Sequence, residues 1–339
     1  MTMQDTLISL AHGNGGRYMR ELIEQVFARH LRGSVLDTTA DAVALPWDSA
    51  EGELVFTTDG FTVQPLEFPG GNIGSLAVHG TTNDLAVAGA VPRYLSLNAF
   101  IEEGFDIATL DRLIASLASA AAELEVQVAA GDTKVLPRGT GGGLYLATTG
   151  IGVRPRGLLL GMQNILEGDA VLVSGPVGAH GIAVLLAREQ FGLRGDLLSD
   201  AASVLPLTLA LRDLPGLHFM RDPTRGGLAT VMHEIAHTTR VGVSLVEEAI
   251  PVQDPVRSVC EMLGYDPYYL ACEGRVIAVV AADCAATALT RWQALPSGRA
   301  AAIIGHMGGA QPGRVTVATA LGGERYLEEL EDDPLPRIC

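Results

Sequence analysis

The sequence predicts a two-domain protein of the α/β or α+β class. The chain has 339 residues, of which 48% are hydrophobic. Predicted strands and helices alternate along both halves, and a turn-prone connector, Arg154-Pro155-Arg156-Gly157, separates them. This length exceeds what one hydrophobic core usually supports, and the alternation is typical of sheets covered by helices. We therefore expect an N-terminal domain over 1–157, a C-terminal domain over 158–325 and a mobile tail over 326–339.

The N-terminal half opens with the glycine-rich segment 12–16, HGNGG. Apolar residues then recur with a period of 3.6 and predict a helix over 17–31. Residues 53–63, rich in Val, Phe and Thr, predict a strand interrupted at Asp59-Gly60. The elements that follow are a helix over 73–87, a strand over 94–100, a helix over 106–124 and strands over 126–130 and 144–153.

The C-terminal half repeats this alternation. The expected elements are a strand over 170–173, helices over 179–191 and 201–214, a helix after Arg225, and strands near Val243, Val276 and Ile303. The last fourteen residues, YLEELEDDPLPRIC, are acidic, contain two prolines and end in Cys339. Such a composition predicts mobility, and the extended segment could reach about 45 Å.

Composition excludes several classes of protein. The chain carries 23 Lys plus Arg against 39 Asp plus Glu, a net charge of −16. This acidic balance argues against nucleic-acid and anionic-membrane partners, which require clustered cations. The four cysteines form no CxxC pair, and the N-terminus lacks the pattern of a secretory signal. We therefore expect a cytoplasmic protein.

Four short segments place an Asp at the end of an element beside small or hydroxylic residues. They are TTDG with Asp59, TND with Asp84, GDTK with Asp132 and DPTRGG with Asp222. A single Asp of this kind usually caps a helix or closes a turn. Together, four carboxylates suit Mg²⁺, and the exposed N–H groups of the opening glycine-rich segment suit phosphate. The sequence therefore suggests a magnesium–nucleotide site, although no P-loop motif is present.

Two residues are unusual for their type. Lys134 is the single lysine beside 22 arginines; it is either an ordinary surface lysine or an ammonium placed on a phosphate. Cys339 is the final residue, and a free thiol there is a liability unless it is used. A thiol on a mobile tail beside a nucleotide site predicts a substrate that is attached to sulfur and then activated by ATP.

His233-Glu234-Ile235-Ala236-His237 matches the HExxH pattern of zinc hydrolases, in which two histidines bind zinc and the glutamate activates water. Glu261 lies at a plausible separation for a third ligand. Against this interpretation, the same helix begins at the DPTRGG segment, which belongs to the nucleotide-site pattern. A zinc hydrolase therefore stays open as an alternative.

Several segments resemble the HypE family of hydrogenase maturation proteins, which are carbamoyl dehydratases in the superfamily of aminoimidazole ribonucleotide synthetase and selenophosphate synthetase. These segments are HGNGG, PGGNIGSLAVHGTTNDLAVAGAVPRYLS, GDTKV, DPTRGG and the terminal PLPRIC. The resemblance covers about residue 10 to 339. Gly60 stands where many relatives carry Ser, and His237 is not part of the family pattern.

The resemblance implies a two-domain PurM-like fold, in which the N-terminal ATP-binding sheet pairs in a dimer barrel and the C-terminal domain is an α/β sandwich. It implies a homodimer, ATP and Mg²⁺ as cofactors, the carbamoyltransferase HypF as donor of a carbamoyl group to Cys339, and the HypC–HypD complex as acceptor of the cyano group for iron. The catalytic residues would be Cys339, Lys134 and Glu273. Nucleotide contacts would come from Gly13, Gly15, Gly16, Asp59, Asn83, Asp84, Asp132, Thr133, Asp222, Arg225, Gly226 and Gly227, with metal ligands Asp59, Asp84, Asp132 and Asp222.

Two further alternatives remain beside the zinc hydrolase. One is a sibling enzyme of the selenophosphate or aminoimidazole ribonucleotide synthetase type. Selenophosphate synthetases place a Cys or selenocysteine near the N-terminus, whereas no Cys precedes Cys260 here. The other is a non-enzymatic assembly scaffold whose tail docks a partner.

Overall fold

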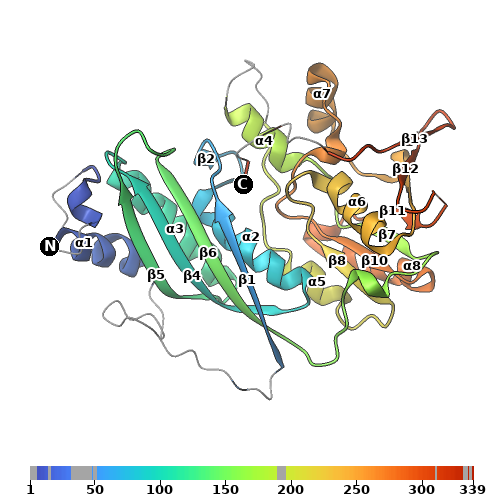
Figure 1. Ribbon diagram of the computed structural model, residues 1–339, viewed down its shortest axis with the longest axis horizontal. Coiled ribbons are helices and arrows are strands. Elements are labelled where there is room, and N and C mark those ends of the chain that lie inside the picture. The colour runs from blue at the N-terminus through green and yellow to red at the C-terminus, as the bar shows by residue number, and fades with distance from the viewer. Residues whose placement is uncertain are drawn as a thin grey trace. The chain divides into compact units, whose positions relative to one another are not determined.

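The computed structural model describes residues 6–13, 17–31, 48, 52–188, 196–309, 311–330, 335 and 338–339. It divides into two compact units. The first runs to Leu85, resumes from Ala90 to Pro155 and includes Cys339; the second comprises Ala86–Gly89 and Arg156–Ile338. Each unit contains a sheet with helices packed on it (Figure 1).

The first unit is built on a four-stranded sheet of order β1-β6-β4-β5. Strands β4 and β5 are parallel and joined through α3, whereas the other pairs are antiparallel. Its elements are η1 (Leu10–Gly13), α1 (Arg17–Leu22), η2 (Ile23–Ala28), β1 (Glu53–Phe61), β2 (Glu67–Phe68), β3 (Gly71–Asn72), α2 (Ile73–Val87), β4 (Val91–Glu102), α3 (Ile107–Glu123), β5 (Gln127–Leu136) and β6 (Leu144–Arg154).

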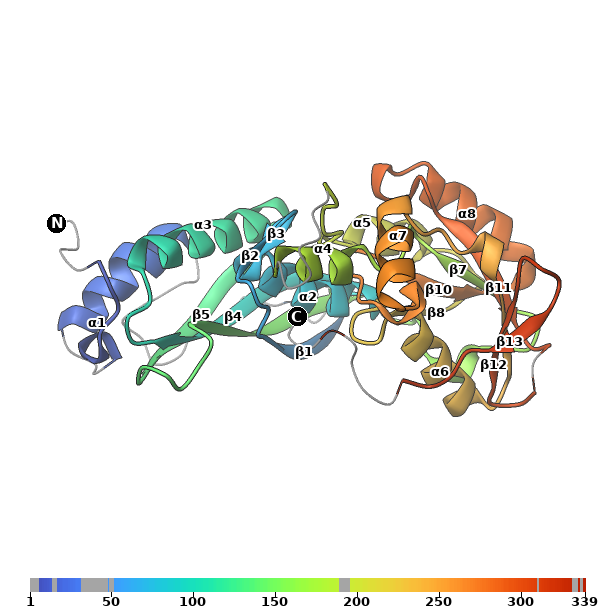
Figure 2. The same ribbon diagram turned by 90° about the horizontal axis from the view of Figure 1, so that it is seen from above.

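Helices α2 and α3 lie on the same face of this sheet (Figure 2). Helix α3 begins after Asp106, whose carboxylate accepts the Thr109 N–H at 2.8 Å, an N-cap that satisfies one of the first free backbone donors. Alternate residues of β4, such as Leu95 and Leu97, are buried. The opposite sheet face carries Phe56 on β1, 69% exposed, and Phe100 on β4, 37% exposed. One sheet face therefore forms the core, and the other presents aromatic side chains to solvent.

Two local predictions in this unit are wrong. Strand β1 continues through Asp59-Gly60, because Gly60 pairs with Ala147 of β6 and the ladder is unbroken. The GDTK segment does not end an element but lies inside β5, where Asp132 pairs with Asn98 of β4. Glycine next to aspartate usually marks a turn, but here pairing with the neighbouring strand satisfies the backbone and overrides that local preference.

The second unit contains a seven-stranded sheet of order β13-β12-β9-β11-β7-β10-β8. Its elements are η4 (Met162–Asn164), β7 (Ala170–Val173), α4 (Ala179–Ala187), α5 (Leu205–Leu211), β8 (Leu217–Arg221), α6 (Gly227–Thr239), β9 (Val243–Val246), η5 (Glu247–Ala249), α7 (Asp254–Leu263), η6 (Pro267–Tyr269), β10 (Ile277–Val280), η7 (Ala282–Cys284), α8 (Ala285–Gln293), η8 (Pro296–Gly298), β11 (Ala302–Met307), β12 (Val315–Ala318) and β13 (Glu324–Tyr326).

The central strands of this sheet are buried on both faces. Val171 and Val173 of β7 belong to the hydrophobic cluster around α6, whereas Leu172 packs with α5 and α8. The helix expected over 201–214 is shorter than predicted, because α5 begins at Leu205, directly before Pro206, which suits the first helical turn but not the interior. The part of the chain that the structure describes contains no helix both long and apolar enough to cross a bilayer.

Candidate functional site

Strand β1 and helix α2 bring together two of the predicted carboxylates. The Thr57 hydroxyl donates to Oδ2 of Asp84 at 3.0 Å. Asp59 shares a strand face with Thr57, because side chains two residues apart point the same way. A Cβ on Gly80 of α2 would lie 3.5 Å from Oδ2 of Asp59, and Gly80 lies one helical turn before Asp84. The side chains of Asp59 and Asp84 therefore both lie where β1 packs against α2.

Gly80 allows α2 to approach β1 closely. A Cβ at that position would lie 2.7 Å from the ring of Phe61, which is 1% exposed and fixed in the core. Asn83, beside Asp84, is also only 1% exposed. The glycine of the HGTTND segment thus lets the helix backbone pack against β1, which places Asp84 next to Thr57.

Asp132 and Lys134 form an ion pair on β5, with Nζ and Oδ2 2.9 Å apart. The backbone N–H of Thr133 donates to the other oxygen of Asp132 at 2.8 Å, and Thr133 itself points into the core. The hydrogen bond from Lys134 is the main reason why the pKa of Asp132 lies below its usual value. Asp132 therefore remains a carboxylate at neutral pH, and Lys134 is paired with a negative charge.

The structure does not bring all the N-terminal site residues together within one chain. Strands β1 and β5 are the two edges of the sheet, separated by β6 and β4. Three strand spacings amount to about 14 Å. Asp59 faces α2, whereas Asp132 lies on the opposite sheet face, because its neighbour Thr133 is the buried one. One metal ion cannot be bound by Asp59 and Asp132 of the same chain.

In the second unit, the DPTRGG segment links β8 to α6. Asp222 follows β8 directly and is 6% exposed. Gly226 and Gly227 adopt φ values of 73° and 59°, and a Cβ on Gly227 would lie 2.5 Å from the backbone oxygen of Leu270. Only glycine fits this left-handed, tightly packed turn. The turn, with Arg225 in it, presents the first N–H groups of a thirteen-residue helix, an arrangement suited to an anion.

Glu273 is fixed close to this turn. The Cys272 N–H donates to the Pro223 oxygen at 3.0 Å, which ties the ACEG segment to DPTRGG. The Glu273 side chain is 3% exposed. Gly274, which follows, is required because a Cβ there would lie 1.9 Å from the backbone oxygen of Asp200. The structure thus groups Asp222 and Glu273 within the second unit.

Ile338 and Cys339 form hydrogen bonds that the sequence did not predict. Oxygen of Cys339 accepts hydrogen bonds from both the N–H and the hydroxyl of Thr62, at 2.9 and 3.0 Å. In the second unit, Nε2 of His180 lies 2.6 Å from the Ile338 oxygen, and Nδ1 lies 2.8 Å from the Ser199 hydroxyl. Burial lowers the pKa of His180, so the ring is neutral: Nε2 donates to the carbonyl and Nδ1 accepts from Ser199. No local motif marks either Thr62 or His180.

Cys339 differs from the other three thiols. Burial raises the pKa of Cys260 to about 11, and burial also raises the pKa values of Cys272 and Cys284. Cys339 is partly exposed. Because the thiolate is the nucleophile, Cys339 is the thiol best placed to react.

The glycine-rich segment 12–16 and the HExxH motif are two further candidates from the sequence. Gly13 ends η1, whereas Gly15 and Gly16 lie outside the described residues, so the phosphate cradle over 12–16 stays a prediction. Glu261 is not in the metal-ligand group that contains His233 and His237; the third member is Glu329. The glutamate that a zinc hydrolase would use as base, Glu234, instead pairs with Arg221 at 3.2 Å. These contacts do not favour the hydrolase alternative.

Comparisons with known proteins show what the chain is similar to. The N-terminal domain of AIR synthase related proteins matches residues 39–154, and the C-terminal domain matches residues 167–318. The chain is 45% identical to carbamoyl dehydratase HypE of Azotobacter vinelandii over 340 residues, covering 100% of this chain and 99% of the relative.

Solved structures give the same result. A crystal structure of hydrogenase maturation protein HypE in complex with ATP matches with a TM-score of 0.91 and 43% identity, covering 97% of this chain and 99% of that one. A HypE–HypF complex matches with a TM-score of 0.79 and 40% identity, covering 91% and 99%. The predicted PurM-like, two-domain fold is therefore confirmed.

Proposed function

The chain belongs to the HypE family of carbamoyl dehydratases, a branch of the AIR synthase related proteins, and on this basis we propose that it uses ATP to dehydrate an S-carbamoyl group on Cys339 to an S-cyanate. The cyano group would supply the cyanide ligand for the iron of [NiFe]-hydrogenase. The observation that carries the proposal is the placement of Cys339: Thr62 holds its backbone oxygen, whereas burial raises the pKa values of Cys260, Cys272 and Cys284.

The reaction removes one water from the carbamoyl group. Its oxygen attacks the γ-phosphorus of ATP and displaces ADP. The carbon–oxygen bond then breaks, phosphate leaves with the former carbamoyl oxygen, and nitrogen gives up two protons as the carbon–nitrogen triple bond forms. Phosphorylation is needed because phosphate is a far better leaving group than the oxygen of an amide. The protein must therefore position the carbamoyl group, stabilise negative charge and accept protons.

Lys134 and Glu273 can divide these tasks. Lys134 forms an ion pair with Asp132, and we assign its compact positive charge to the stabilisation of phosphate charge. Glu273 is a buried carboxyl, 3% exposed, and we assign it to accept the protons that leave nitrogen. Both assignments are part of the proposal.

The proposed nucleotide contacts of the first unit include Asn83 on α2, and those of the second unit include the glycine turn at the start of α6. A related HypE has been crystallised with ATP. The phosphates suit Arg225 and the backbone N–H groups at the positive end of α6. Gly13, Gly15, Gly16, Thr133, Gly226 and Gly227 complete the proposed nucleotide contacts.

The carboxylate donor set fits Mg²⁺, which prefers oxygen ligands and keeps water and phosphate oxygens in its shell. Asp59, Asp84, Asp132 and Asp222 would hold it, and when bound it neutralises charge on the phosphates. Because Asp59 and Asp132 lie on opposite edges and faces of one sheet, we propose that two chains combine their carboxylates.

We propose a homodimer formed through the N-terminal sheet. The sheet face opposite α2 and α3 exposes Leu54, Phe56 and Phe100, and β1 and β5 are its edge strands. Exposed apolar faces and free edges favour pairing with a partner. A second copy would cover this face and bring β5 of one chain near β1 of the other.

For partners outside the dimer, we propose HypF as the carbamoyl donor, since a related HypE forms a complex with HypF. We propose the HypC–HypD complex as the acceptor of the cyano group, and the cytoplasm as the compartment. The net charge of −16 is consistent with the absence of a nucleic-acid partner.

Intact-mass measurement tests the proposed reaction. After incubation with HypF and a carbamoyl source, the protein should gain one carbamoyl group, and it should lose the mass of one water only when ATP is added. Cys339→Ser should gain nothing, whereas Cys284→Ser, a matched change at another cysteine of intermediate exposure, should behave as the original protein does. A dehydrated adduct in Cys339→Ser would overturn the proposal.

A further inference from the structure

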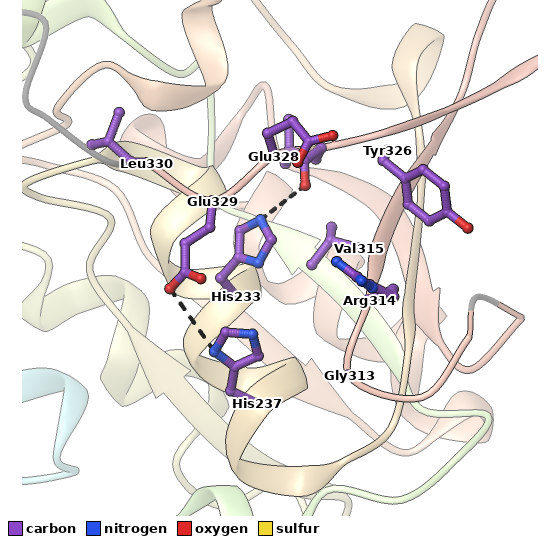
Figure 3. Close-up of a pocket in the computed structure, with 10 residues that line it drawn as sticks. His233, His237, Gly313, Arg314, Val315, Tyr326, Glu328, Glu329 and Leu330 are labelled. Carbon is purple, nitrogen blue, oxygen red and sulfur yellow. Dashed lines mark hydrogen bonds and ion pairs between the residues drawn. The ribbon is translucent and has the colours of Figure 1, made fainter.

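Helix α6 and the segment after β13 bring together three side chains that the dehydratase reaction does not use. His233 and His237 lie one turn apart on α6, with ring centroids 5.9 Å apart. Glu329 approaches them, with its Oε1 3.9 Å from Nδ1 of His237. Figure 3 shows the three side chains converging on one side of the helix. One ligand atom from each lies within 4.8 Å of the other two.

His233 is oriented as a metal ligand would be. Its Nε2 lies 2.9 Å from the backbone oxygen of Leu327. A carbonyl oxygen can only accept, so Nε2 carries the proton and Nδ1 has the lone pair. His233 is 7% exposed, and Nδ1 has no hydrogen-bond partner among the described residues. Burial removes the water that would hydrogen-bond to this nitrogen, and this costs free energy unless another group or an ion binds it. A backbone carbonyl on the other ring nitrogen is the usual way to fix a ligating histidine.

The surroundings have room for an ion and its water. These side chains line a pocket of about 300 Å³ with Arg314 and Tyr326. Arg314 is the nearby positive charge, but its guanidinium lies over the Tyr326 ring, 6.0 Å from the centroid. Ligand atoms around a tetrahedral zinc ion are about 3.4 Å apart. His237 and Glu329 are 50% and 63% exposed in their side chains, so both can rotate to close the remaining distance.

We propose that His233, His237 and Glu329 bind one divalent transition-metal ion, best matched by Zn²⁺, with water in the fourth position. Two imidazoles and one carboxylate favour zinc over magnesium, which prefers oxygen ligands alone. The role is structural, because Glu234 is engaged by Arg221 and not directed to the ion as a base. The metal fastens the segment 327–330 to α6.

Three hydrogen bonds already hold this segment, and one of them is the bond from Nε2 of His233 to the Leu327 oxygen. Leu327 is 2% exposed and donates its N–H to the Val315 oxygen at 3.0 Å. The Tyr269 hydroxyl donates to the Glu328 oxygen at 2.6 Å. A metal bond to Glu329 adds a further attachment, at the residue that follows Glu328.

Metal titration of the full chain tests this. The protein is first dialysed against a chelator and then titrated with Zn²⁺ or Co²⁺. We expect one Zn²⁺ per chain by elemental analysis, and one Co²⁺ per chain with the visible absorption of a four-coordinate site. His237→Gln and Glu329→Gln should each weaken Zn²⁺ affinity by about tenfold or more. His306→Gln, an exposed histidine of the same unit, and Glu328→Gln should stay within twofold of the original protein. The two ligand variants alter exposed side chains, so they should fold even if changes at His233 do not.

Hydrogen exchange tests the structural role separately from any activity. Zn²⁺ should slow amide exchange over 327–330 in the original protein and in Glu328→Gln, but not in Glu329→Gln. No stoichiometric binding, or equal affinity in the ligand variants and their controls, would overturn the metal site. Stoichiometric binding with unchanged exchange over 327–330 would overturn the fastening role.

Discussion

Thr62 donates two hydrogen bonds to one oxygen of Cys339, a residue 277 positions later in the chain. The side-chain bond can be removed without the backbone bond, because the Thr62→Val variant keeps nearly the same shape and loses only the hydroxyl. A typical intramolecular hydrogen bond contributes about 0.5–1.5 kcal/mol. We expect Thr62→Val to slow ATP-dependent dehydration of the carbamoylated protein about tenfold. Thr290→Val, the same change on the exposed side of α8, should have no effect; equal rates in all three proteins would show that this bond does not position Cys339.

The four thiols should differ in reactivity. Burial raises the pKa values of Cys260, Cys272 and Cys284, which lowers the thiolate fraction of each near neutral pH. We expect iodoacetamide to alkylate Cys339 first, as measured by peptide mass spectrometry over time. The fast phase should disappear in Cys339→Ala. Alkylation of Cys284 as fast as that of Cys339 would contradict this prediction.

Lys134 should control the titration of Asp132. The hydrogen bond from Lys134 lowers the pKa of Asp132 below its unfolded value, so the stabilisation is present above that unfolded value and is lost as pH falls through the folded pKa. Both side chains are at least half exposed, so solvent screens the effect on stability. In Lys134→Met, carboxyl NMR should show the pKa of Asp132 rising toward its ordinary value. The pKa of Asp106, lowered by Thr109, is the internal control and should not move.

Mixing of inactive variants should reveal whether two chains share the site. Asp59→Asn and Asp132→Asn should each abolish dehydration. If Asp59 of one chain works with Asp132 of the other, the mixed dimer has one intact site, and subunit exchange should restore roughly a quarter of the original activity. Asp59→Asn mixed with Asp84→Asn should restore nothing, because Thr57 and Gly80 place those two carboxylates in the same chain's half of the site. Absence of recovery in the first mixture would contradict the shared site.

The glycine turn before α6 should tolerate no side chain. Gly227→Ala must accept both a φ of 59° and a Cβ 2.5 Å from the Leu270 oxygen. Gly264→Ala is a matched control, with a φ of 74° but nothing within 4 Å. The left-handed conformation alone costs about 1–2 kcal/mol, and we expect Gly227→Ala to lose at least about 2 kcal/mol more than Gly264→Ala in urea unfolding. Equal losses in the two variants would mean that the backbone relaxes to remove the clash.

A local pattern is enough to predict helix α2, which has the predicted bounds 73–87. The local pattern is misleading at Asp59-Gly60 and at Asp132, because glycine next to aspartate has a strong local preference for turns, and only pairing with β6 and β4 overrides it. Glu261 was the wrong third partner for His233 and His237, since spacing along the chain does not show that Glu329 returns to α6 from after β13.

Contiguous motifs such as NDLAVAGAVPRYLS and the terminal PRIC identify the family without a structure, and the alternation of predicted strands and helices indicates the two-domain α/β class. Only the folded chain shows which of the candidate carboxylates meet. It placed Asp59 beside α2 and Asp132 on the far edge of the same sheet, and it gave Cys339 a partner in Thr62. Each of these relationships depends on strand pairing or on contacts between residues distant in the sequence, which no local pattern encodes.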